Sequence, residues 1–138
     1  MKQKIKTLKF IHLAFVVGIT LAYFILGDFE NIFKMVIDNS SLLYAFIPAI
    51  AYVFSNFLFK NMLKNVKREA SNEEKLAIYQ TASIVRWAVI EGACFIILFL
   101  KPDFLLLGVI LLIYMILLAP KEHQISRTLD IKDSELQS

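Results

Sequence analysis

The sequence predicts an all-α integral membrane protein, a four-helix bundle with a short interfacial helix between its first and second spans. Of its 138 residues, 58% are hydrophobic, whereas a soluble domain is roughly 45–50% apolar. The apolar residues fall in blocks close to the ~20 residues that cross a ~30 Å hydrocarbon core, instead of being spread at a helical period. Lys and Arg gather in alternate connections, which is typical of multi-pass proteins.

We expect one membrane domain over residues 1–120 and a polar cytoplasmic tail over residues 121–138, because the length leaves no room for a separate soluble module. Ile125 and Leu129 are the only helically spaced apolar pair of the tail. Weak docking or disorder of the tail is therefore expected. The four spans are expected at about residues 8–26, 42–59, 82–100 and 104–119.

The first apolar run, Phe10 to Leu26, is too long for the hydrophobic part of a signal peptide. Ile25 and Gly27 also make a poor cleavage site. We therefore interpret this run as a retained span. Residues 28–38 then place apolar and polar side chains on opposite faces of a helix that is too short to span, which predicts a helix lying in the interface. The alternative is an amphipathic connector that only packs.

Single residues and a short motif predict a kink in the second span, the start of the third helix and the end of the fourth span. Pro48 lies inside the second span, where it should kink the helix and free the carbonyl of Tyr44. Ser71 and Glu74 have the spacing of a capping box, which predicts that the third helix begins there. Pro120 ends the fourth span.

The orientation follows from the Lys and Arg residues of each connection. The N-terminal segment holds four, the 60–75 loop holds five and the tail holds three. The two connections on the other side hold one each, Lys34 and Lys101. We expect both termini and the middle loop in the cytoplasm, with the chain in the bacterial cytoplasmic (inner) membrane.

Glu91 is the main candidate for chemistry, because it lies about nine residues, or ~14 Å, from either end of the third span. A charged group at that depth is expensive, so we expect a neutral carboxylic acid that donates a hydrogen bond inside a helix–helix contact. Its candidate partners are Tyr52, Tyr114 and the carbonyl of Tyr44. Two interpretations stay open: a proton- or cation-binding site, and a protonated acid that joins helices.

His12, Asn56 and Arg86 each lie about four residues inside the expected cytoplasmic boundary of their spans. Arg86 and Glu91 are five residues apart and cannot pair within one helix, which requires a spacing of three or four. The three residues predict a polar layer that serves as a headgroup or anion site, or as the inner mouth of a pathway. The alternative is three separate interfacial residues.

Small residues recur every four positions on two spans, which lets another helix approach closely. These helix-packing candidates are Ala14, Gly18 and Ala22 on the first span, with Ala88 and Gly92 on the third.

Several classes of function find no support in the sequence. The net charge is only +3, so no nucleic-acid partner is expected. No nucleophile–base pair, metal-ligand spacing, phosphate-binding glycine loop or redox motif is present, and Cys94 is a single cysteine inside a span. We therefore expect no enzyme, no catalytic residue, no cofactor and no metal.

The segment YQTASIVRWAVIEGACF, with the AP…I…LDI…E pattern of the tail, resembles a group of small four-span bacterial membrane proteins without an assigned activity. The resemblance covers most of the chain and implies the same topology. A mid-depth Glu is also similar to that of rotary ATPase c subunits and of small multidrug transporters. The former, however, have two spans with a glycine-rich partner helix, and the latter carry the Glu on the first span.

The sequence thus predicts a non-enzymatic structural or accessory subunit of a membrane complex. Its partners would be the lipid bilayer and either further copies of the chain, as a homo-oligomer, or other membrane subunits. The alternative is a proton-coupled small transporter or proton-translocating subunit that uses Glu91.

Overall fold

The computed structural model describes residues 2–27, 29–31, 42–67, 69–100 and 104–136. Within these ranges the chain is helical and has no strand. The predicted interfacial helix at 28–38 lies largely outside the described residues, which include only a 3-10 turn, η1, from that stretch. The elements in chain order are α1 (Lys2–Leu26), η1 (Phe29–Asn31), α2 (Leu42–Lys64), α3 (Asn72–Leu100), α4 (Leu105–Leu117), α5 (Glu122–Leu129) and α6 (Asp133–Leu136).

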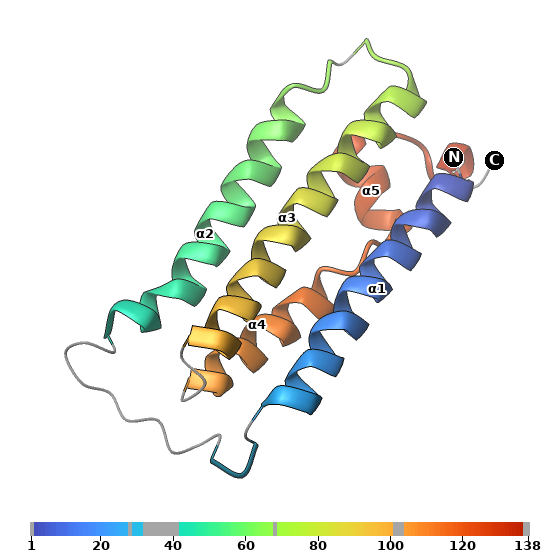
Figure 1. Ribbon diagram of the computed structural model, residues 1–138. Coiled ribbons are helices and arrows are strands. Elements are labelled where there is room, and N and C mark those ends of the chain that lie inside the picture. Colours follow the sequence, from blue (N-terminus) through green and yellow to red (C-terminus); the bar gives the residue numbers. More distant parts are fainter. Residues whose placement is uncertain (1, 28, 32–41, 68, 101–103, 137–138) are drawn as a thin grey trace.

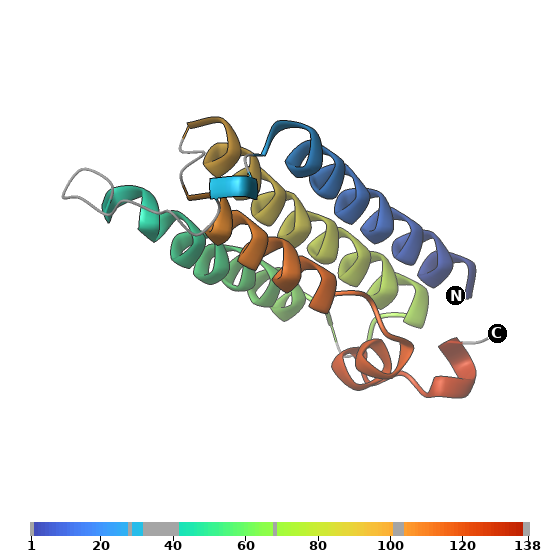
Figure 2. The ribbon, with the colours of Figure 1, turned by 90° about the horizontal axis from the view of Figure 1, so that it is seen from below.

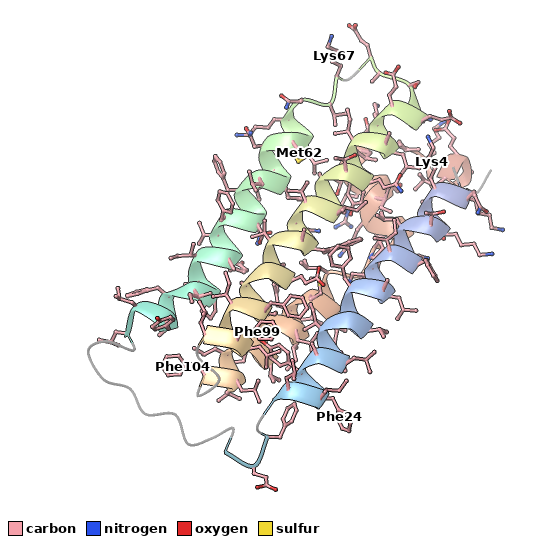
Figure 3. The ribbon with its side chains drawn as sticks, in the orientation of Figure 1. Lys4, Phe24, Met62, Lys67, Phe99 and Phe104 are labelled. Atoms are coloured by element: carbon pink, nitrogen blue, oxygen red, sulfur yellow. The ribbon has the colours of Figure 1, made fainter. Side chains whose placement is uncertain are left out.

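Helix α3 is the centre of the arrangement. It packs against α2 on one side and α1 on another, and α4 lies behind it (Figure 1). Figure 2 shows the same grouping from below, with α5 turned away from the direction of α4. The start of α1, the α2–α3 connection and α5 all lie at one end of the bundle. We call this end the basic end, because Lys4 and Lys67 lie there, whereas Phe24, Phe99 and Phe104 lie toward the other (Figure 3).

Three helices, α1, α2 and α3, are long and apolar enough to cross a membrane. A fourth span exists only if α4 and α5 are counted together, and these two helices meet at an angle of 75°. The 13 residues of α4 extend about 20 Å at 1.5 Å per residue, less than a ~30 Å core. The predicted span at 104–119 is therefore a shorter helix than expected, followed by a sharp bend near Pro120.

The start of α3 confirms one local prediction. The backbone N–H of Glu74 donates a hydrogen bond to the Ser71 hydroxyl oxygen at 3.2 Å. This bond satisfies one of the amides that a helix leaves free at its first turn. Pro48 lies inside α2, as the sequence predicts, and the helix continues on both sides of it.

The tail differs from the expectation of weak docking or disorder. It forms α5 and α6, and Ile125 is fully buried while Leu129 is 4% exposed. Ile131 and Leu136 are buried as well. Helix α5 packs against α3 at the basic end, which the short α4 does not reach. The two apolar residues of α5 thus face the bundle, and Ile131 and Leu136 extend this buried surface.

Candidate functional site

Glu91 lies on α3 between Trp87, which faces α1, and the exposed Ala88. At 100° per residue it is about 40° around the helix from Trp87 and about 140° from Arg86. The Trp87 ring contacts two rings of α1, with centroids 4.9 Å from His12 and 6.2 Å from Phe15. The Glu91 side chain is partly exposed. Within the described part of the chain, no hydrogen bond or ion pair joins its carboxyl to another residue.

The two tyrosines proposed as partners of Glu91 contact each other instead. The ring centroids of Tyr52 on α2 and Tyr114 on α4 are 5.1 Å apart. Asn56 joins them, because its side-chain amide donates to the Tyr114 hydroxyl at 2.7 Å and to the Tyr52 carbonyl at 2.8 Å. This cluster lies between α2 and α4, away from the α1 side of α3. The role of Glu91 as a proton or cation site stays a prediction.

The three residues of the predicted polar layer make different direct contacts. His12 is buried, and its Nε2 lies 2.7 Å from the Met115 carbonyl oxygen of α4. Asn56 belongs to the tyrosine cluster. Arg86 lies over the Phe59 ring of α2, with its Cζ 3.7 Å from the ring centroid. Among the described residues, no hydrogen bond connects the three, so each links a different pair of helices.

The small residues that the sequence predicts as packing positions differ from Gly108 in their surroundings. A Cβ built on Gly18 or Gly92 would have nothing within 4 Å, and Ala14 and Ala88 are exposed while Ala22 is partly so. Ala14, Gly18 and Ala88 thus face away from the core of this single chain. Ala22 packs against the core, and Gly92 lines a groove between α2 and α3. Gly108, which the sequence analysis did not single out, is the close-packed one, since a Cβ there would overlap the Tyr23 side chain.

Tyr23 and Gly108 belong to a buried contact among α1, α3 and α4. The Tyr23 hydroxyl donates a hydrogen bond to the Cys94 carbonyl at 2.6 Å. The Cys94 Sγ in turn lies 3.8 Å from the Gly108 carbonyl oxygen. Cys94 is fully buried, so this thiol serves packing at the point where three helices meet.

A cavity of about 340 Å³ lies at the basic end, next to Arg86. We call it the arginine cavity, because Arg86 of α3 and Arg127 of α5 both line it. Arg86 is a residue of the predicted polar layer, whereas Arg127 was not predicted from the sequence, since the tail was not expected to dock. The other lining residues are Phe59, Tyr79, Leu117, Leu118, Gln124 and Thr128.

The described residues contain no group of three or more His, Cys, Asp or Glu side chains placed to hold a metal ion. Comparison with protein-family models, curated proteins and solved structures finds no match to this chain. The resemblance to small four-span bacterial membrane proteins therefore stays a prediction.

Proposed function

We propose that this protein is a non-enzymatic, multi-pass subunit of a membrane complex, which associates through the outer face of α3. The observation that supports this most is the open space at Gly92, beside the exposed Ala88. Both residues line an apolar groove of about 320 Å³ between α2 and α3, whose lining also includes Ala51 and Phe54. In a bilayer, close approach at small residues is a main source of helix association.

The location that goes with this proposal is the bacterial cytoplasmic membrane, with the basic end in the cytoplasm. Two features support it. Twelve of the 15 Lys and Arg residues belong to the N-terminal segment, the 60–75 loop and the tail, and these segments meet at one end of the bundle. The positive-inside rule places such an end in the cytoplasm.

The association surface on α3 can be tested with Gly92→Leu, and Gly18→Leu tests the exposed small residues of α1 in the same way. Each leucine would point into open space in the single chain, so the fold should persist. In the complex it would separate two helices that otherwise touch. We expect the dissociation constant of the homo-oligomer to rise about tenfold, which corresponds to ~1.4 kcal/mol. Light scattering after size-exclusion chromatography in mild detergent measures this.

Thr20→Leu is the matched control, because Thr20 is exposed on α1 and lies about 200° around the helix from Gly18. It should leave the oligomer unchanged. A wild-type chain that is monomeric at all concentrations and co-purifies with no membrane protein would contradict the proposed function.

A second candidate, a proton-coupled carrier, is favoured by one observation. Glu91 is a partly exposed carboxyl near mid-span, without a hydrogen-bond partner among the described residues. Intramembrane acids of this kind serve as proton sites in pumps and transporters. Such a carrier would need Glu91 to reach water from both sides of the membrane.

Glu91→Gln separates the two candidates, because Gln keeps the size and hydrogen bonding of Glu but cannot release a proton. For an accessory subunit we expect wild-type assembly and an equally low proton flux in both proteins. Proteoliposomes carrying a pH-sensitive dye, under an imposed membrane potential, measure the flux. A clear wild-type flux that Glu91→Gln removes, with assembly intact, would replace the accessory proposal by the carrier.

A further inference from the structure

We infer that the arginine cavity is a binding site for a phosphate group, held by Arg86 from α3 and Arg127 from α5. The inference is independent of the proposed function, because it concerns the opposite side of α3 from Glu91 and none of the small residues. The same phosphate chemistry is available from two sources, the headgroup of an anionic phospholipid and a soluble phosphate.

The composition of the cavity is the first argument. Its polar lining residues are Arg86, Arg127, Gln124, Thr128 and Tyr79, and its lining includes no Asp or Glu. All of these groups can donate hydrogen bonds. The volume of about 340 Å³ lies within the range of small-ligand sites. A cavity with several donors and two positive charges selects an anion.

The state of Arg86 is the second argument. Its Nε is buried and has no hydrogen-bond partner. Among the described residues, no ion pair joins a carboxylate to the Arg86 guanidinium. The Phe59 ring covers one face of the guanidinium and leaves the N–H groups at its edge to other partners. The Arg86 side chain as a whole is partly buried. A partly buried cation without a counter-ion is less stable than a paired one, and a phosphate bound in the cavity would supply that counter-ion.

The choice of arginine is the third argument. A guanidinium presents its N–H groups in a planar fork that matches two oxygens of one phosphate, which a lysine ammonium does not. Arg127 adds a second fork from α5, which Ile125 and Leu129 fix in place. The Arg127 Nη2 lies 3.4 Å from the His123 ring, a weak contact that leaves the guanidinium free to turn toward an anion.

The cavity lies at a depth that both a lipid headgroup and a soluble phosphate can reach. Arg86 lies about four residues, or ~6 Å, inside the expected membrane boundary. The phosphate groups of the lipids begin at this boundary. Helix α4 ends at Leu117, and α5 continues at 75° to it. One side of the cavity is thus formed by the apolar helices near their ends, and the other side by α5 of the tail.

The test is thermal unfolding of the full chain in neutral detergent, followed by the fluorescence of Trp87, the single tryptophan. The probes are dioleoyl phosphatidylglycerol, dioleoyl phosphatidylcholine as the chain-matched neutral lipid, and inorganic phosphate at constant ionic strength. A ligand that binds only the folded state raises the melting temperature. For the wild type we expect a rise of roughly 5 °C at saturation with one of the two anionic probes and not with phosphatidylcholine.

Arg127→Gln should remove at least half of this rise, and so should Arg86→Gln. Arg127 is exposed, so its variant is expected to fold even if the Arg86 variant does not. Lys121→Gln removes one charge from an exposed residue that does not line the cavity and should keep the full rise. A response to phosphatidylglycerol alone identifies a lipid headgroup, and a response to inorganic phosphate identifies a soluble source. The inference is wrong if neither probe raises the melting temperature, or if Arg127→Gln and Lys121→Gln respond alike.

Discussion

The Gly108→Ala variant is expected to be less stable than the wild type by about 1–3 kcal/mol, the usual cost of adding a group to a filled core. The new methyl group would overlap the hydroxyl end of Tyr23. Tyr23 is 1% exposed, and its hydroxyl is bonded to the Cys94 carbonyl at 2.6 Å. The ring therefore cannot move aside without breaking that bond, and the substitution should force α1 and α4 apart.

Gly18→Ala and Gly92→Ala are the matched controls for this prediction. The same methyl group meets nothing within 4 Å at either position, and Ala is the better helix former by about 0.5–1 kcal/mol. Both variants should melt at or slightly above the wild-type temperature in mild detergent. Equal melting temperatures for all three variants would contradict the packing described for Tyr23 and Gly108.

Much of the fold could be predicted from the sequence, because long apolar blocks depend on local composition alone. The blocks around Gly18, Pro48 and Glu91 all lie in helices long enough to span, and the Ser71 cap formed as its spacing predicted. The tail could not be predicted in this way. Its docking depends on the space that the short α4 leaves beside α3, and that space exists only after three helices have packed.

The candidate site was less predictable, because a helical period gives the face of a residue but not the helix that covers the face. Tyr52 and Tyr114 were expected near Glu91 from their depth, yet they meet each other between α2 and α4. Arg127 joins Arg86 at one cavity across 41 positions of sequence. Neither arrangement leaves a periodic or spacing signal, since both depend on which helices become neighbours.

The Ile125→Ala variant is expected to release α5 from the bundle. Ile125 is fully buried, and loss of a buried isoleucine side chain costs about 2–5 kcal/mol. Because α5 has few other buried residues, most of this cost should appear as local opening of the tail. Cleavage by trypsin after Lys121 and Arg127 would then become roughly 30-fold faster or more, since proteolysis follows the population of the open form.

His123→Ala is the control for this prediction, because His123 is exposed on the same helix and its removal should change stability by less than about 0.5 kcal/mol. Similar cleavage rates in the two variants would mean that Ile125 does not hold α5.

The Ile125→Ala variant also tests the arginine cavity, because release of α5 withdraws Arg127 from it. Faster cleavage should therefore be accompanied by a smaller phosphate-dependent rise in melting temperature. If the tail opens and the full rise remains, Arg86 alone binds the anion and the two-arginine site is wrong.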